Sequence, residues 1–141
     1  MIIRPGKSSD IIHMYKLLHQ EWTTSEEMSH EMKLRQFDNC LLNNSTFLVA
    51  EDSNKIIGML MLHIQCKLIR NGSSAAFIEE VIVDENNRGK GIGVQLVHHA
   101  CDIAKILGCY KITLSCFEDR IAFYERCGFD NESYSMRLNI K

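Results

Sequence analysis

The fold of this chain is decided by residues 77–93, which read FIEEVIVDENNRGKGIG. The stretch begins as an apolar strand that carries two acids, Glu79 and Glu80, and it ends in a loop with three glycines. Apolar residues at helical spacing follow, from Leu96 to Leu107, so the loop starts a helix. Such a loop can turn unpaired backbone N–H groups toward one anion, which the helix dipole also attracts. The stretch therefore predicts a pyrophosphate-binding turn between a strand and a helix.

Two other phosphate-binding motifs do not fit this loop. No Lys-Ser/Thr pair follows Gly93, as a P-loop would require, and the spacing differs from the dinucleotide fingerprint G-x-G-x-x-G. A nucleotide triphosphatase is therefore disfavoured. The remaining alternative is an ordinary glycine turn that caps a helix and binds nothing.

The first forty residues predict two amphipathic helices. The first covers residues 8–22, and its inward positions are Ile11, Tyr15, Leu18 and Trp22. The second starts at a capping box in residues 24–27 and carries Leu34, Phe37 and Leu41 inward.

The rest of the chain predicts a mixed sheet and two more helices. Strands are expected at 46–50, 56–65 and 75–83, with polar turns between them, which suggests an antiparallel meander. Gly108 ends the helix after the glycine loop, and a strand at 109–115 then completes a parallel crossover. A short helix at 121–127 and a last strand at 134–140 follow. We expect one α/β (α+β) domain over residues 1–141.

Composition narrows the class of protein. The net charge of -2 gives no global field for nucleic acid, and no apolar run is long enough for a signal peptide or a membrane span. The six scattered cysteines predict free buried thiols, and neither the cysteines nor the six histidines form a metal-binding motif. We expect a soluble cytoplasmic protein that binds no metal, nucleic acid or membrane.

Two ordered motifs resemble the GCN5-related N-acetyltransferase (GNAT) family. The first is Arg88-x-x-Gly91-x-Gly93 after an acidic apolar strand, and the second is the segment FYERCGF at residues 123–129. The resemblance implies a mixed, mostly antiparallel sheet with splayed central strands, flanked by helices. It also implies acetyl-CoA as the acetyl donor. The residues expected to contact the coenzyme are Val81, Ile82, Val83, Arg88, Gly89, Lys90, Gly91, Ile92, Gly93, Val94, Tyr124 and Arg126.

The same resemblance assigns the chemistry. Glu79 or Glu80 takes the proton of the amine, directly or through water. Successive strand residues point to opposite faces, so only one acid is expected to face the cleft, and the resemblance favours Glu79. The Val81 N–H polarises the thioester carbonyl, and Tyr124 protonates the leaving thiolate. The alternatives are two solvated acids and a core tyrosine, and no acyl-cysteine is expected.

Within the family, the segments GCYKI at 108–112 and FYERCGF at 123–129 are similar to glucosamine-6-phosphate N-acetyltransferases. That likeness implies glucosamine 6-phosphate as acceptor, a role in UDP-N-acetylglucosamine synthesis and a homodimer. It places Glu79, Tyr110, Lys111 and Ser115 near the acceptor. Residues 62–65 and the tail are also similar to aminoalkylphosphonate N-acetyltransferases. A polyamine, a protein lysine or N-terminus, and a non-catalytic acyl-CoA-binding module remain as alternatives.

Overall fold

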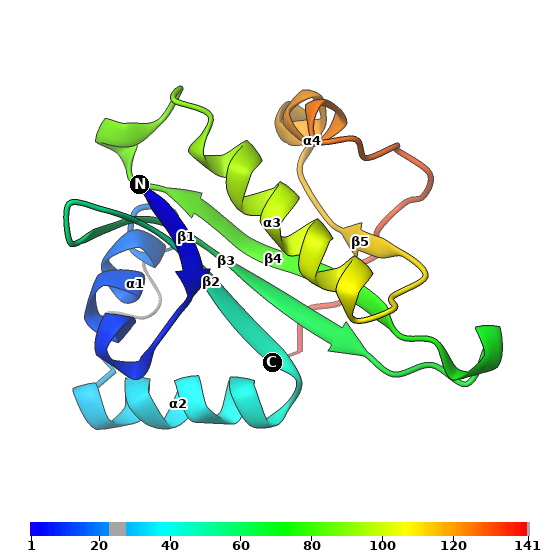
Figure 1. The fold of residues 1–141 in the computed structure, drawn as a ribbon, viewed down its shortest axis with the longest axis horizontal. Coiled ribbons are helices and arrows are strands. Elements are labelled where there is room, and N and C mark those ends of the chain that lie inside the picture. The colour runs from blue at the N-terminus through cyan, green and yellow to red at the C-terminus, as the bar shows by residue number, and fades with distance from the viewer. Residues whose placement is uncertain (23–27, 141) are drawn as a thin grey trace.

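The computed structural model of the chain describes residues 1–22 and 28–140. Five strands form one sheet in the order β1-β2-β3-β4-β5 (Figure 1). All neighbouring strands are antiparallel except β4 and β5, which are parallel. The strands are β1 (Ile2–Pro5), β2 (Ser45–Asp52), β3 (Lys55–Gln65), β4 (Ala75–Val83) and β5 (Ile112–Leu114). The main helices are α1 (Ile11–Leu18), α2 (His30–Leu42), α3 (Ile92–Ile106) and α4 (Ile121–Arg126).

The expected antiparallel meander is present, and β4 has the predicted bounds. Ser53 and Asn54 both have positive φ values, of 49° and 61°, which is the backbone that a two-residue hairpin between β2 and β3 requires. The sequence pattern did not reveal β1, which extends the sheet by pairing with β2 from Ile2↔Glu51 to Pro5↔Leu48. Four residues are too short to display a clear alternation.

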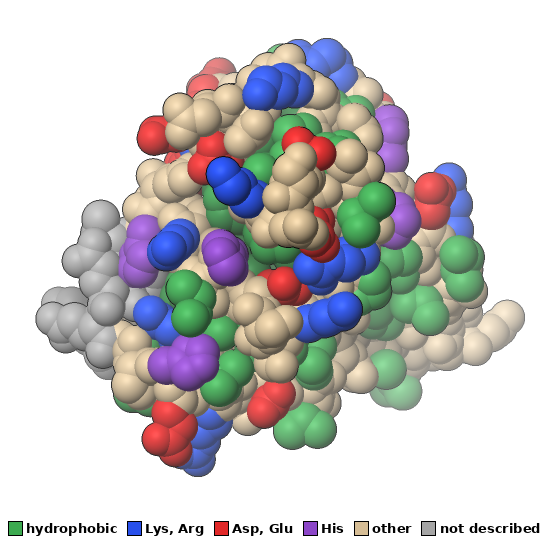
Figure 2. All heavy atoms as spheres, turned by 60° about the vertical axis from the view of Figure 1, so that its left-hand side comes forward, with side chains coloured by type: hydrophobic (Ala, Val, Ile, Leu, Met, Phe, Trp, Pro, Cys, Tyr) green, Lys and Arg blue, Asp and Glu red, His purple; other side chains and the backbone are tan. Residues whose placement is uncertain are grey.

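Helices lie on both faces of the sheet, and the second face is covered only in part (Figure 1). Helix α3 packs on one face, where Leu96 and Val97 are fully buried against Leu48 and Leu60. Helices α1 and α2 cover the other face of the first strands, through Met14 and Phe37 among others. The outer surface carries mixed charges, and acidic and basic side chains are interspersed on the face shown in Figure 2.

The first helix is shorter than predicted and turned differently. Residues 8–10 form a 3-10 turn, and α1 then ends at Leu18, so Trp22 lies beyond it with 48% of its surface exposed. The residues that α1 buries are Ile11, Met14 and Leu17, whereas Tyr15 and Leu18 are only partly buried. The prediction took Tyr15 rather than Met14 as an inward position, so the predicted buried face of the helix was shifted by one residue.

The second helix also begins later than predicted. The expected capping box at 24–27 lies outside the described residues, and α2 is capped by Ser29, whose hydroxyl accepts from the Met32 N–H at 3.2 Å. Phe37 is buried as predicted and Leu34 is partly buried, but Leu41 is 45% exposed.

The predicted strand at 134–140 is wrong. These residues form no strand, and Tyr134, Met136, Leu138 and Ile140 are 83–100% exposed. Alternating apolar residues form a strand only where a neighbouring strand offers hydrogen bonds, and none is present here within the described residues. Among residues 1–22 and 28–140, no helix is long and apolar enough to cross a bilayer.

Candidate functional site

The glycine loop leads into α3 through two left-handed residues. Gly89 and Gly91 both have φ of 76°, a conformation that other residues resist, and Gly91 caps the helix with no side-chain hydrogen bond. The first backbone N–H bonded to the helix start is that of Gln95, which donates to Gly91 O at 3.1 Å. The three preceding N–H groups, of residues 92–94, are therefore left to an external acceptor.

The surface of this loop is open where an anion would approach. A Cβ atom added at Gly89 or Gly91 would have no heavy atom within 4 Å. A bound group can thus come close to the backbone at both residues. Free N–H groups, a helix start and open space together fit a diphosphate, which is the part of acetyl-CoA that such a turn would hold.

The two basic side chains of the loop already have partners: Arg88 bonds to the end of β4 and to Glu21, and Lys90 bonds to the turn before the glycines. Arg88 donates from Nε to Val83 O at 3.0 Å, and from Nη2 to Glu21 Oε1 at 2.9 Å. Lys90 Nζ donates to Asn86 O at 3.3 Å and to the Asn87 side chain at 3.0 Å. Both cations hold the loop in shape, so the backbone amides are the groups presented outward.

A further support of the loop was not apparent from the sequence. Asp84 accepts from the Asn86 N–H at 3.0 Å and from the Asn87 side chain at 3.1 Å, which closes the turn that precedes the glycines. Gln20, just after α1, donates to Asp84 at 3.3 Å and accepts from the Glu85 N–H at 3.2 Å. A contact over more than sixty positions of sequence leaves no local pattern.

Strands β4 and β5 part beside this loop. They pair only from Ala76↔Ile112 to Ile78↔Leu114, whereas β4 continues to Val83. The half of β4 that follows Ile78 therefore has no partner on the β5 side among the described residues. This is the splayed pair of strands that the family resemblance implied, and Val81 lies in the unpaired half.

A bulge in β4 changes which residues face which side. The pairing of β3 with β4 shifts between Met59 and Met61, and Glu80 has φ of 52°. Ile78 and Val81, three positions apart, both pack in the α3 cluster, so strict alternation fails between them. The expectation that Glu79 and Glu80 point to opposite faces, drawn from alternation, is therefore wrong at this point of the strand.

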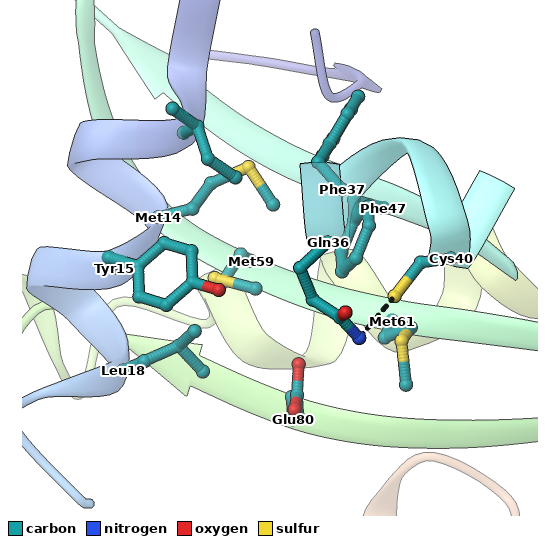
Figure 3. A pocket seen from close by; sticks show the side chains of 11 residues that line it. Met14, Tyr15, Leu18, Gln36, Phe37, Cys40, Phe47, Met59, Met61 and Glu80 are labelled. Atoms are coloured by element: carbon teal, nitrogen blue, oxygen red, sulfur yellow. Dashed lines mark hydrogen bonds between the residues drawn. The ribbon is translucent and has the colours of Figure 1, made fainter. Parts of the chain in front are cut away.

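The two carboxylates have different surroundings. Glu79 is exposed and lies opposite Met61, whereas Glu80 is partly buried and projects toward the space between α1 and α2 (Figure 3). Burial, and in second place the charge of Glu79, raises the pKa of Glu80. Glu80 thus has the properties of a stronger base than an ordinary exposed carboxylate.

Glu80 closes one side of a pocket of about 220 Å³ between α1, α2 and the sheet (Figure 3). Tyr15 and Gln36 stand across from it, and the Gln36 amide donates to Cys40 Sγ at 4.0 Å. Burial raises the pKa of both Tyr15 and Cys40, and the Glu80 charge adds to the effect. The pocket residues come from five separate elements, so no local sequence pattern could reveal that they share a site.

Tyr124 lies on α4 among aromatic rings. Its ring meets those of Phe123 and Phe129 edge to face, with centroids 4.8 and 6.2 Å away. Phe123 in turn contacts the start of α3, where a Cβ at Gly93 would approach its ring to 3.1 Å. Burial raises the pKa of Tyr124, so its phenol holds the proton at neutral pH. Tyr124 is thus held near the glycine loop by the Phe123 ring, which packs between them.

The remaining predicted coenzyme contacts divide by burial. The side chains of Ile82 and Ile92 are 2% and 5% exposed in the core, so only their backbone is available. Val83 and Val94 are partly buried against the α3 cluster. Arg126 is exposed at the end of α4 and forms no ion pair within the described residues.

The four predicted acceptor residues are not all brought together. Ile112 and Leu114 pack with the α3 cluster, and the exposed Lys111 and Ser115 flank the three-residue strand on its two ends. Tyr110 and Lys111 come just before β5, and the Arg70 guanidinium and the Lys111 ammonium are each 5.7 Å from the Tyr110 ring centroid. Tyr110 and Ser115 therefore lie before and after β5 rather than side by side on it.

The cysteines are free, but most of them are not buried as predicted. Only Cys127 is buried, whereas Cys66 and Cys116 are exposed and the other three are partly exposed. Across residues 1–22 and 28–140, no three His, Cys, Asp or Glu side chains are grouped so that they could hold a metal ion.

Comparisons with known proteins give consistent results. The model of the family described as Acetyltransferase (GNAT) family matches residues 11–129. The chain is 33% identical over 121 residues to glucosamine 6-phosphate N-acetyltransferase 1 of Dictyostelium discoideum, covering 83% of this chain and 77% of the relative. It is 41% identical over 86 residues to the glucosamine 6-phosphate N-acetyltransferase of Arabidopsis thaliana, covering 61% and 58%.

Solved structures agree with these sequence relatives. The crystal structure of the Arabidopsis thaliana glucosamine-6-phosphate N-acetyltransferase superposes with a TM-score of 0.91 at 32% identity, covering 99% of this chain and 98% of the other. An acetyltransferase of Trypanosoma brucei superposes with a TM-score of 0.92 at 30% identity, covering 99% of both chains.

Proposed function

Because this chain belongs to the acetyltransferase (GNAT) family, we propose that it transfers the acetyl group of acetyl-CoA to the primary amine of glucosamine 6-phosphate. The observation that carries the proposal is the open turn at Gly89 and Gly91, which follows the half of β4 that has no partner in β5. The choice of acceptor rests on the names of the relatives, which the chain matches at 33–41% identity.

Acetyl-CoA supplies an activated thioester, and residues of this chain would bind and orient it. The amides of residues 92–94 would hold its diphosphate, and the unpaired half of β4 would lie along its arm. The Val81 N–H would donate to the carbonyl oxygen as negative charge develops there. Tyr124, which keeps its proton at neutral pH, would protonate the departing sulfur.

We assign removal of the amine proton to Glu80. The bulge directs this carboxylate into a partly buried position, where burial raises its pKa as a general base requires, whereas Glu79 is exposed. Glu79 would then orient the acceptor along the open face of the sheet. Loss of a general base costs about 100-fold or more in rate. We therefore expect Glu80→Gln to reduce kcat by about 100-fold and Glu79→Gln to act mainly on KM.

The deciding experiment is a thiol-release assay with acetyl-CoA and four acceptors: glucosamine 6-phosphate, an aminoalkylphosphonate, unphosphorylated glucosamine and a lysine peptide. We expect the highest kcat/KM with the sugar phosphate, with N-acetylglucosamine 6-phosphate identified by mass. Preference for the aminoalkylphosphonate would reassign the acceptor within the same chemistry. Binding of acetyl-CoA without amine-dependent thiol release would instead indicate a non-catalytic acyl-CoA-binding module.

We further propose that the protein is a cytoplasmic homodimer. The exposed tail supports the dimer, because Tyr134, Met136 and Leu138 present apolar side chains that a second copy would cover. Six free thiols suit a reducing compartment. Light scattering should give twice the chain mass for the full protein and the single mass after removal of residues 134–141. A full-length monomer would refute the dimer, and detection outside the cytoplasmic fraction would refute the location.

A further inference from the structure

The loop between β4 and α3, residues 84–91, is not held in place by core packing. None of the side chains of residues 85–91 is buried, and Gly89 and Gly91 have open space around them. The hydrogen bonds that Asp84 and Lys90 make with Asn86 and Asn87 run within the loop. These bonds fix the shape of the loop, but they do not fix its position against the rest of the molecule.

Two side chains from the turn after α1 hold this loop from outside. The Gln20 amide donates to Asp84 Oδ2 at 3.3 Å and accepts from the Glu85 N–H at 3.2 Å. Glu21 Oε1 accepts from Arg88 Nη2 at 2.9 Å. The backbone of β3 fixes only the first residue of the loop, through a 2.9 Å hydrogen bond from the Asp84 N–H. Gln20 and Glu21 therefore extend the hold from the start of the loop to its middle.

The turn that carries these two side chains is itself anchored. The N–H groups of Gln20 and Glu21 donate to the carbonyl oxygens of Leu17 and Leu18 at 3.0 and 3.1 Å, so the turn continues the hydrogen bonding of α1. Helix α1 is fixed in turn by Met14 and Leu17, which are 2% and 3% exposed and pack in the cluster on the second face of the sheet. The position of α1 is thus passed on to the loop.

We propose that Gln20 and Glu21 are positioning residues for the diphosphate of the acetyl donor. They hold the loop at Glu85 and Arg88, so that the amides of residues 92–94 are in place before the donor arrives. Ordering a loop at the moment of binding costs free energy, and a loop that is already ordered avoids this cost. The inference rests on the acetyl-CoA-dependent transfer proposed above and deepens it. Both residues act through the loop and not on the reacting atoms.

A competing arrangement would have Arg88 leave Glu21 and bind the diphosphate itself. The geometry favours the fixed arrangement, because Arg88 Nε also donates to Val83 O at 3.0 Å, and two bonds hold the guanidinium in one plane. Glu21→Gln separates the two. A weaker neutral acceptor should raise the Kd of CoA by about threefold, since the ion pair is exposed. Tighter binding by this variant would show that Glu21 competes with the diphosphate and would overturn its assignment.

The role of Gln20 is tested by comparing acetyl-CoA with acetyl-pantetheine, a donor that has no diphosphate. Gln20→Ala should raise the KM of acetyl-CoA about tenfold, leave kcat unchanged and leave kcat/KM for acetyl-pantetheine unchanged. Asn43→Ala is the matched control, because it removes an exposed amide hydrogen bond, of 2.7 Å to Asn39 O, at the end of α2. It should change neither donor. Equal losses with both donors, or no loss with acetyl-CoA, would overturn the proposal.

A reversal of the hydrogen bond separates positioning from a general loss of stability. Gln20→Glu sets two carboxylates against each other and should raise the Kd of CoA more than about tenfold. Adding Asp84→Asn restores a donor and an acceptor, keeps the net charge of the wild type and should return the Kd to within about threefold. A double variant no better than Gln20→Glu would contradict the proposal. Calorimetric titration with CoA needs no turnover: a wild type that binds no CoA refutes the proposed function, whereas a Kd that is the same in all Gln20 variants refutes only this inference.

Discussion

Replacing Gly91 with alanine should weaken coenzyme binding beyond its effect on folding. Gly91 has φ of 76°, and alanine in this left-handed conformation costs about 1–2 kcal/mol of stability. The added methyl group would meet no protein atom within 4 Å, so the protein itself tolerates its bulk, and any added cost to binding would come from the diphosphate held by the next three amides. Loss of one hydrogen bond to a charged group is worth about 1.5–3 kcal/mol, which is roughly 10- to 100-fold in Kd.

Gly108→Ala is the matched control for this variant. Gly108 lies at the other end of α3, has φ of 70°, and likewise has open space around an added Cβ. Both variants should lower Tm by a similar amount, about 4 °C for each kcal/mol lost. Calorimetric titration with acetyl-CoA should show the weaker Kd for Gly91→Ala only. Equal Kd values for the two variants would refute the assignment of the loop to the diphosphate.

Three further changes test the remaining groups. Tyr124→Phe should lower kcat about 100-fold and leave the Kd of acetyl-CoA unchanged, because only the proton donor is lost; unchanged turnover would make Tyr124 a packing residue. Asp10→Asn should cost about 2 kcal/mol of unfolding free energy, since Asp10 accepts from Arg4 at 2.7 and 3.1 Å. The Arg4 hydrogen bond lowers the pKa of Asp10 below its ordinary value of 3.8. In urea unfolding, the difference in unfolding free energy between wild type and Asp10→Asn should therefore narrow as pH falls below 3.8. A difference that stays constant with pH would contradict the role of this ion pair. Glu80→Gln should gain stability relative to wild type as pH rises above the ordinary carboxylate value of 4.5. Burial raises the pKa of Glu80, so the unfolded chain loses that proton first; melting curves with the opposite trend would contradict its burial.

The fold around the glycine loop was predictable because its signals are local. The bounds of β4, the left-handed Gly108 after α3 and the parallel pairing of β4 with β5 all follow from residues close in sequence. The family assignment made from Arg88, Gly91 and Gly93 is confirmed by the family match over residues 11–129.

The site itself was less predictable because it depends on contacts between distant segments. The bulge at Glu80 is a departure from alternation, so a rule that assumes alternation assigns the wrong face to one of the two acids. The pocket is lined by residues of α1, α2, β2, β3 and β4. The hydrogen bond from Gln20 to Asp84 likewise joins segments that are far apart in the sequence. In the tail at 134–140 the alternation is clear, yet no strand forms, because no neighbouring strand among the described residues pairs with it.

The central claim is that the start of α3 grips the diphosphate of acetyl-CoA. It is tested most directly by following backbone amide resonances of the labelled protein during titration with the coenzyme. The largest shifts should occur at Ile92, Gly93 and Val94, with a smaller set along β4 near Val81. An absence of saturable shifts, or a response concentrated on α2 instead of the loop, would contradict it.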